Sequence, residues 1–384
     1  MKRTYISLLV LFICLGTVGV EAQSLRALAE SHGIHFGAAV TFPGSNLAAY
    51  DSALSQNFNT VVCENDMKWT NTENTRNVFT FTAADGLVNF ATAHGMYIRG
   101  HNFVWHSQIP TWVSNMTNRD TLLAVMKNHI NQLAGHWKGK IYEWDVVNEA
   151  IADGSTSLRS SVWSNRIGTD FLDSAFVYAH RADSNAWLVY NDYGAEGMTG
   201  STATKSTGVY NLVSGLKSRG IPINGVGLQC HFSLNGFDTA SMSANMSRLE
   251  ALGLNISITE LDITTSNTTA NLAAQAANYK SMMDLCLRHP RCKTFMAWGV
   301  NDAQSWKGAS AVALLFTGTS TITAKPAVDS IIVSLGNATG IWQVHNYRPG
   351  VLQQRGVMGL FNVHGSTFDV AGRKLSILPV SLPK

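Results

Sequence analysis

Short apolar runs that end on polar residues recur along the chain. Eight of them stand at residues 33–40, 59–65, 97–105, 142–149, 187–194, 225–232, 255–262 and 294–302. Helix-like segments such as 121–137 and 207–220 lie between them. Strands that alternate with helices predict parallel βαβ units, and eight such units predict an α/β fold, a TIM barrel, over residues 23–336. The alternative is an open doubly wound sheet, which needs a glycine-rich phosphate-binding turn that the sequence lacks.

Polar side chains gather at the predicted carboxyl ends of these strands. They are Glu64, Asn65, His101, Asn148, Glu149, Asn191, Asp192, Tyr193, Gln229, His231, Glu260, Asp262 and Trp298. All strands of a TIM barrel end at one rim, and active sites of this fold are built there. Because an unpaired buried carboxylate is costly, the stretch YEWDVVNE at 142–149 predicts that Glu149 faces a cleft.

Composition narrows the classes of function. The chain has 384 residues, of which 45% are hydrophobic and 14% charged, and its net charge is +3. Without a basic run, nucleic acid and acidic membrane surfaces are poor candidate partners. Two basic residues precede a short apolar run in MKRTYISLLVLFICLGTVGVEAQS, which predicts a signal peptide over residues 1–22, cleaved after Ala22, and a secreted protein. The alternative is a membrane anchor, for which the run is short.

The cysteines divide into three groups. Cys14 lies in the predicted signal peptide, and Cys286 and Cys292 bound a short loop that a disulfide could close in an oxidising compartment. Strand alternation points Cys63 and Cys230 outward on opposite sides of the barrel, so both are predicted to be buried free thiols. Metal-ligand spacing is absent from the sequence, and we expect no metal site.

Two of the rim carboxylates suggest a chemistry. Glu149 follows the fourth predicted strand and Glu260 the seventh. Paired carboxylates across a cleft are the equipment of a glycosidase, in which one protonates the leaving oxygen while the other attacks the anomeric carbon or activates water. A single glutamate at a strand end is more often a solvated rim residue. The pair, within an aromatic-rich rim, favours the glycosidase.

Seven stretches resemble one enzyme family, in its order and at about its spacing. They are CENDMKW (63–69), GHNFVWHSQIPTW (100–112), WDVVNEA (144–150), NDY (191–193), GLQCHF (227–232), ITELDI (258–263) and WGVNDAQSW (298–306). Over roughly residues 25–336 the chain resembles glycoside hydrolase family 10, the endo-β-1,4-xylanases. The resemblance implies a TIM barrel and a retaining mechanism, with Glu149 as general acid/base and Glu260 as nucleophile. Donors from His231 and Asn148 are expected to keep Glu260 ionised.

The same resemblance assigns sugar-binding positions. They are Glu64, Asn65 and Lys68 on the non-reducing side of the cut, His101, Trp105, Asn148, Gln229, His231, Trp298 and Trp306 around the cleaved sugar, and Tyr193 on the leaving-group side. Aromatic rings suit this task because the C–H groups of a sugar lie flat on them. Asp262 is expected to support the site from behind, whereas Trp69, Trp137 and Trp144 are expected in the core.

The resemblance also has consequences for partners. It matches a disulfide at Cys286 and Cys292, and it implies xylan and xylo-oligosaccharides as substrates. We expect a monomer without a cofactor. Two other activities stay open: a retaining barrel hydrolase that cleaves β-1,4-glucan, and a barrel that only binds polysaccharide.

Residues 337–384 lie beyond the predicted barrel. Short strand patterns there predict a β-rich C-terminal appendage. The alternatives are a secretion-sorting segment and a domain that is cut short.

Overall fold

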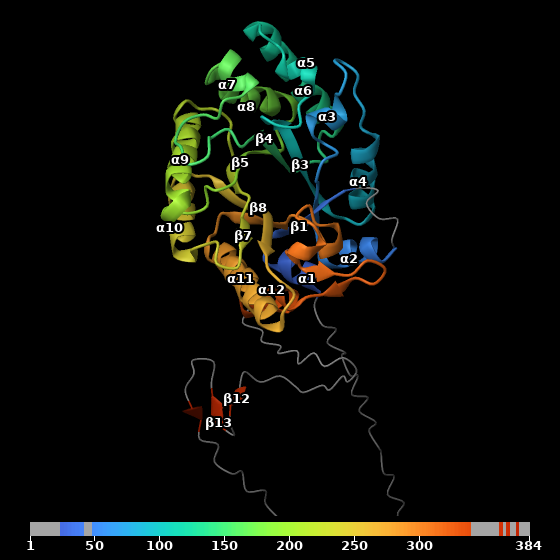
Figure 1. Cartoon of the computed structure of the whole chain (residues 1–384), viewed down its shortest axis with the longest axis vertical. Coiled ribbons are helices and arrows are strands. Elements are labelled where there is room, and N and C mark those ends of the chain that lie inside the picture. Colours follow the sequence, from blue (N-terminus) through green and yellow to red (C-terminus); the bar gives the residue numbers. More distant parts are fainter. Residues whose placement is uncertain (1–23, 42–47, 339–360, 364–365, 369–373, 376–384) are drawn as a thin grey trace, which may run out of the picture.

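Parallel pairing links the strands all the way round a closed sheet (Figure 1). The computed structural model describes residues 24–41 and 48–338, and three short strands beyond them. Consecutive strands pair side by side, β9 returns to β1, and β6 pairs with β8 to complete the barrel. The barrel strands are β1 (His35–Val40), β2 (Thr60–Cys63), β3 (Tyr97–Val104), β4 (Glu143–Asn148), β5 (Trp187–Asp192), β6 (Gly225–Leu228), β8 (Asn255–Thr264) and β9 (Cys292–Ala297). The predicted TIM barrel is confirmed.

Helices occupy the segments between the strands and form the outer layer in Figure 1. They are α1 (Leu25–Ser31), α2 (Ala48–Asn57), α3 (Trp69–Thr72), α4 (Thr82–Ala93), α5 (Thr111–Ser114), α6 (Arg119–His136), α7 (Val162–Arg166), α8 (Asp170–Ala182), α9 (Ala203–Ser218), α10 (Thr239–Ala251), α11 (Thr269–Arg288) and α12 (Pro326–Ala338). Side-chain caps begin several of them. The Asn118 carboxamide accepts from Thr121 N at 2.9 Å at the start of α6, which satisfies one of the free N–H groups there.

The main core lies between the strands and the helices. Trp137 and Trp144 are each 1% exposed and Trp69 is 2% exposed, so all three are core residues as predicted. Gly100 on β3 allows Trp144 to pack against the backbone, because a Cβ at that glycine would lie only 2.1 Å from the indole ring. Between β9 and α12, a small hairpin of β10 (Phe316–Thr317) and β11 (Thr323–Ala324) follows the loop that carries Trp306.

The sixth predicted strand, residues 225–232, is wrong as a single strand. It divides into β6 and the short β7 (His231–Ser233), which pairs with β8. The break falls at Gln229 and Cys230, and Cys230 has a φ of 63°, in the left-handed region that strands do not use. Because the strand is interrupted here, Gln229 and His231 lie at the rim, just beyond the end of β6.

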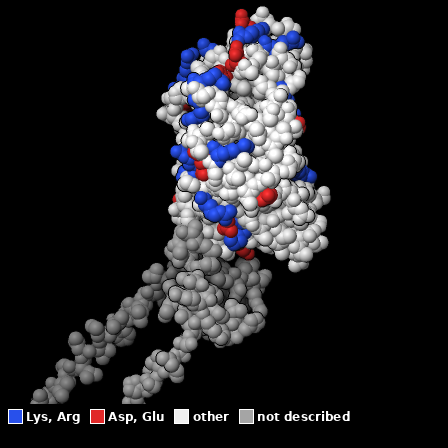
Figure 2. Space-filling model, turned by 90° about the vertical axis from the view of Figure 1, so that its left-hand side faces the viewer, with Lys and Arg blue, Asp and Glu red and all other residues white. Residues whose placement is uncertain are grey.

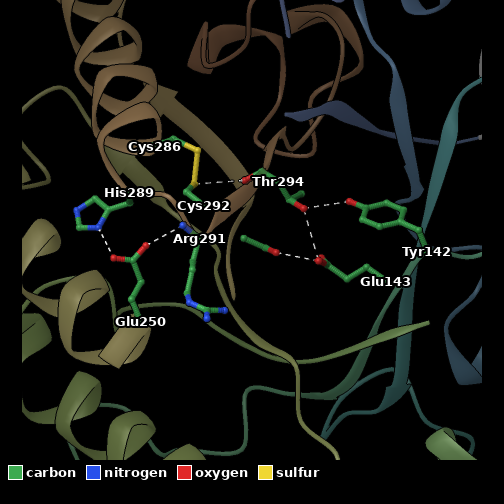
Figure 3. Close-up of a disulfide and its surroundings, with 9 residues drawn as sticks. Tyr142, Glu143, Glu250, Cys286, His289, Arg291, Cys292 and Thr294 are labelled. Carbon is green, nitrogen blue, oxygen red and sulfur yellow. Dashed lines mark hydrogen bonds and ion pairs between the residues drawn. A yellow bond between two sulfur atoms is a disulfide. The ribbon is translucent and has the colours of Figure 1, made fainter. Parts of the chain in front are cut away.

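The disulfide prediction is confirmed. Cys286 at the end of α11 is bonded to Cys292 at the start of β9, with the two Cα atoms 5.3 Å apart (Figure 3). Cys63 and Cys230 are free and fully buried, also as predicted. The bond therefore ties the last turn of a long outer helix to the first residue of a barrel strand.

Three strands lie near the C-terminus, β12 (Phe361–Val363), β13 (Ser366–Phe368) and β14 (Lys374–Leu375). They pair antiparallel as one sheet, and the appendage over residues 337–384 stays a prediction. The predicted signal peptide, residues 1–22, lies outside the described residues. Of the helices that the structure describes, none is long and apolar enough to cross a membrane. Figure 2 shows a largely uncharged face on which basic side chains lie among acidic ones.

Candidate active site

Both candidate catalytic glutamates lie at the carboxyl end of the barrel. Glu149 directly follows β4, and Glu260 lies on β8 two residues beyond Ile258, where the pairing with β6 ends. Glu149 is 9% exposed and Glu260 is 4% exposed. Parallel strands end at the same rim, so the fold brings these distant segments together. Because both carboxyl groups are nearly buried, their hydrogen-bond partners determine whether the charged form is stable.

Glu260 is surrounded by hydrogen-bond donors. Its Oε1 accepts from Asn191 Nδ2 at 2.8 Å, and its Oε2 lies 3.2 Å from His231 Nε2. The other imidazole nitrogen, Nδ1, lies 2.8 Å from Asp262. Burial alone would lower the pKa of His231, but the bonds to Asp262 and Glu260 raise it to about 9. At neutral pH His231 is therefore an imidazolium that donates to both carboxylates.

The charge of His231 changes the ionisation of Glu260. Burial alone would raise the pKa of Glu260, but the hydrogen bond from His231 and nearby positive charge hold it below its usual value. Glu260 is thus ionised over the neutral range despite its burial. The expectation that Asn148 donates to Glu260 was wrong: Asn191 is the amide donor, and the Asn148 amide instead lies 2.9 Å from that of Asn191.

The position of Asn191 depends on two residues of neighbouring strands. Its Oδ1 accepts from Thr259 Oγ1 at 2.7 Å, which orients the amide nitrogen toward Glu260. A Cβ at Gly227 would lie 2.2 Å from the same Oδ1. Only glycine at this position on β6 leaves room for the amide.

Glu149 has different partners from Glu260. Its Oε2 accepts from Trp105 Nε1 at 2.9 Å, and its Oε1 accepts from Gln229 Nε2 at 3.0 Å. His106 Nδ1 lies 3.8 Å from Oε2, and burial lowers the pKa of His106. Neutral indole and amide donors thus hold Glu149, whereas an imidazolium holds Glu260. Two carboxyl groups in unlike surroundings can take unlike protonation roles.

A buried ion group supports the floor of the site. Arg99 is fully buried and pairs with Glu143 at 2.7 Å and with Asp145. Asp145 Oδ2 in turn lies 2.7 Å from His101 Nδ1. Burial lowers the pKa of His101 to about 3 and raises that of Asp145 to about 7. His101 is therefore neutral, and Asp145 orients the imidazole.

The same region contains a candidate metal-binding trio. Within the described ranges, one suitable atom each from His101, Asp145 and Glu260 lies within 4.8 Å of the others. Each of these groups already has protein partners: Asp145 pairs with Arg99, and Glu260 accepts from Asn191. The trio is accordingly arranged as part of an internal hydrogen-bond network.

The predicted non-reducing side gathers three polar residues from the segment after β2. Lys68 Nζ donates to Asn65 Oδ1 at 3.1 Å and lies 4.9 Å from the centre of the Trp105 ring. Glu64 lies 3.3 Å from Thr41. Lys68 is 6% exposed, and burial lowers its pKa. The contact with Trp105 places this group beside Glu149.

Two tryptophans flank the imidazoles of the rim. Trp298 follows β9, and its ring meets that of His101 edge-on with centroids 5.2 Å apart. Trp306 donates its Nε1 to Asp262 at 2.8 Å and meets His231 at 5.1 Å. Trp298 is 5% exposed, whereas Trp306 is 51% exposed and offers an open ring to a ligand. Asp262 thus supports the site from behind, through His231 and Trp306.

Tyr193 lies on the opposite side of Glu149 within a charged cluster. Its hydroxyl donates to Asp153 at 2.8 Å and accepts from Arg159 at 3.1 Å. The Lys205 ammonium lies 3.5 Å from the centre of the ring. Three charged residues therefore fix the position of the ring.

Comparison with known proteins identifies the family. Residues 24–334 match Glycosyl hydrolase family 10. The chain belongs to this family. It is 34% identical over 316 residues to endo-1,4-beta-xylanase B of Thermotoga neapolitana, which covers 80% of this chain and 89% of that protein. It is 38% identical over 289 residues to exoglucanase XynX of Acetivibrio thermocellus, covering 71% of this chain and 26% of that one.

A solved structure of a xylanase has the same fold as this chain. Xylanase 10B of Thermotoga petrophila RKU-1, in complex with xylobiose, superposes with a TM-score of 0.78 and 35% identity. The match covers 83% of this chain and 98% of that chain. The barrel therefore has a structural counterpart in a solved xylanase.

Sequence reasoning placed Asn191 at the rim but assigned it no role, and it did not single out His106 or Arg159. Asn191 contacts Glu260, His106 lies beside Glu149, and Arg159 Nε donates to the Glu149 carbonyl at 3.1 Å. Asn191 and His106 lie inside stretches that carried the resemblance, and that position could have signalled them. Arg159 lies in a loop outside every such stretch, and no signal in the sequence singles it out.

Proposed function

We propose that this protein is a secreted endo-1,4-β-xylanase that cleaves internal xylosidic bonds with retention of configuration. Glu149 is the general acid/base and Glu260 the nucleophile. The observation that carries the proposal is the contrast between the two carboxyls: an imidazolium lowers the pKa of Glu260, whereas neutral donors hold Glu149. Membership of family 10 supports it.

The first step forms a glycosyl-enzyme. A Glu260 oxygen attacks the anomeric carbon, and the bond from that carbon to the glycosidic oxygen breaks. The proton of Glu149 moves to the departing oxygen, which leaves as a sugar hydroxyl. Glu260 becomes an ester and loses its charge, and Glu149 becomes a carboxylate.

The second step reverses these roles. Glu149 removes a proton from water, the water oxygen attacks the anomeric carbon, and the ester bond to Glu260 breaks. His231 then again faces two carboxylates, Glu260 and Asp262. The imidazolium favours release of Glu260, because it stabilises the negative charge that returns.

Substrate binding follows the two sides of the cut. On the non-reducing side, Glu64, Asn65 and Lys68 supply hydrogen bonds, and Trp306 offers a half-exposed ring to the cleaved sugar. Around the cleaved sugar the contacts come from His101, Trp105, Asn148, Gln229, His231 and Trp298. Tyr193 supplies the ring on the leaving-group side. Aromatic faces and fixed polar groups together suit a pyranose chain.

The signal-like leader and the disulfide support secretion. Disulfides persist in oxidising compartments and are rare in reducing ones. Cys286 and Cys292 form such a bond in a chain whose first residues have the order of a signal peptide.

Hydrolysis of β-1,4-glucan is the second candidate. One specific observation favours it: a relative of 38% identity is named exoglucanase. Glucose carries a hydroxymethyl group that xylose lacks, and the space for it lies on the non-reducing side. Lys68, Glu64 and Trp306 would have to leave that space. Parallel assays on xylan and carboxymethyl-cellulose separate the two candidates.

The test compares wild type with Glu260→Ala, with and without azide. We expect active wild type, an inactive variant, and rescue by azide with an α-xylosyl azide as product, because azide replaces the missing nucleophile. Rescue with a β-azide, or an active Glu260→Ala, would refute the role of Glu260. Activity on glucan but not xylan would favour the second candidate, and binding without hydrolysis would contradict an enzyme.

A further inference from the structure

Two residues in left-handed backbone conformation flank β5. Glu149 follows β4 with a φ of 57°, and Cys230 follows β6 with a φ of 63°. β5 lies between β4 and β6 in the barrel. A side chain with a Cβ rarely adopts this conformation, since the Cβ crowds the backbone, so neighbouring contacts must stabilise it.

On the β4 side, the contacts come from the Tyr190 hydroxyl. This oxygen accepts from Ala150 N at 3.0 Å and from Ile151 N at 3.2 Å, and it donates to Asp192. Asp192 is paired with Lys205 at 2.9 Å. Tyr190 and Asp192 are both fully buried. The two peptides that follow Glu149 are thus held by one hydroxyl, whose orientation is set by a buried carboxylate.

On the β6 side, the contact comes from the Glu196 carboxylate. Its Oε1 accepts from Cys230 N at 3.2 Å and from Gly194 N at 3.1 Å. Glu196 is 3% exposed. The residues on either side of Cys230 are Gln229, which donates to Glu149, and His231, which contacts Glu260. One buried carboxylate therefore holds the turn from which both glutamates receive a partner.

We propose that Tyr190, Asp192 and Glu196, here called the β5 clamp, are positioning residues for the two glutamates. The Tyr190 hydroxyl fixes the direction of Glu149, and Glu196 fixes Gln229 and His231. The three come from β5 and the loop after it, so one segment sets the geometry on both neighbouring strands. This inference rests on the proposed roles of Glu149 and Glu260.

The first test removes one oxygen atom. Tyr190→Phe keeps the buried ring but leaves two peptide N–H groups without their acceptor. Because Glu149 is needed to protonate a poor leaving group, we expect kcat/KM on xylotetraose, which reports the steps up to formation of the glycosyl-enzyme, to fall about 10- to 100-fold. On dinitrophenyl β-xylobioside, whose phenolate departs without a proton, we expect kcat/KM to change by less than about threefold, because the base role of Glu149 comes after the step that this constant reports. A merely structural role would lower both rates together.

Tyr142→Phe is the matched control. Tyr142 directly precedes β4, at the other end of the barrel from the rim, and its hydroxyl lies 3.1 Å from Thr294 Oγ1 (Figure 3). Like Tyr190→Phe, this substitution removes one hydroxyl oxygen from a tyrosine of the barrel. We expect the ratio of the two rates to equal that of wild type, whatever the loss of thermal stability. An altered ratio in Tyr142→Phe would remove the support for a specific role of Tyr190.

The second test compares two substitutions at Glu196. Glu196→Gln keeps an oxygen that can accept from Cys230 N and Gly194 N, whereas Glu196→Ala removes it. We expect Glu196→Ala to slow both substrates about tenfold or more, because His231 acts on Glu260 in every turnover. Glu196→Gln should restore most of the rate. Equal rates for the two variants would overturn the β6 side of the proposal, and this arm stands even if Tyr190→Phe fails to fold.

Glu149→Ala separates failure of the β5 clamp from failure of the proposed function. If Glu149 is the acid, this variant should lose xylotetraose hydrolysis and retain the step that releases dinitrophenolate. If it loses both equally, the role of Glu149 itself is wrong. If Glu149→Ala behaves as expected and Tyr190→Phe has the wild-type ratio, only the clamp is overturned.

Discussion

Removing the Cys286–Cys292 disulfide should lower the free energy of unfolding while leaving catalysis nearly unchanged. The bond joins the end of α11 to the first residue of β9 (Figure 3). Trp298, the rim residue of this strand, follows its other end. The bond therefore restrains the unfolded chain and the outer layer, and is separated from the reacting atoms by the length of a strand.

The expected magnitude follows from the loop that the bond closes. The two cysteines are six positions apart, so the closed loop contains seven residues. The chain-entropy relation for a loop of this length gives about 2.4 kcal/mol at 25 °C. A change of this size lowers the thermal midpoint of a domain of this class by about 5 °C. A short loop keeps the effect moderate, because the unfolded chain closes it easily.

Urea unfolding of wild type and of Cys286→Ala/Cys292→Ala, each with and without reductant, measures the effect. Reductant should move wild type to the midpoint of the double variant and should leave the variant unchanged, which controls for reduction elsewhere. Rates on xylan should agree within about twofold at temperatures where every form is folded. An unchanged wild-type midpoint after verified reduction, or a rate that falls with stability, would refute this reasoning.

Three further outcomes are expected. In the folded protein the pKa of His231 is about 9, above its usual 6.5. The stabilisation of the folded protein by protonated His231 is therefore fully present below pH 6.5 and is lost as pH rises through 9, by at most about 3 kcal/mol. Urea unfolding across this range should show the decline in wild type and a smaller one in Asp262→Asn. Arg99→Met should cost about 3–5 kcal/mol by leaving buried carboxylates unpaired; a loss below about 1 kcal/mol in urea unfolding would contradict this account. Trp306→Ala should raise KM for xylotetraose several-fold with little change in thermal midpoint, because the ring is 51% exposed; an unchanged KM would exclude Trp306 from binding.

Local pattern was sufficient for much of this molecule. Each of the eight predicted runs overlaps a barrel strand, and the polar residues at their ends do lie at one rim. These predictions succeed because the hydrophobic pattern of each strand is visible in its own residues, and parallel pairing places the carboxyl ends of all strands at one rim. Cys63 and Cys230 are buried and free as predicted, although Cys230 lies at the break after β6, where strand alternation does not apply.

Partner choice within the rim was predicted less well. Asn148, next to Glu149 in the sequence, was expected to donate a hydrogen bond to Glu260, but Asn191 is the donor. The choice depends on the register of three strands and on the absence of a Cβ at Gly227, which no local pattern records. The break at Cys230 was missed for a similar reason, since a left-handed residue inside an apolar run has no signature when it is not glycine.

Sequence by itself determined the barrel, the rim and the pair of glutamates, because hydrophobic periodicity and strand-end chemistry are local properties. Tertiary structure alone decided that Asn191, and not Asn148, donates to Glu260, and that neutral indole and amide donors hold Glu149. It also decided that the loop after β5 reaches both neighbouring strands, with Tyr190 on one side and Glu196 on the other. Hydrogen bonds between segments far apart in the chain depend on register and distance, and those quantities exist only once the sheet has closed.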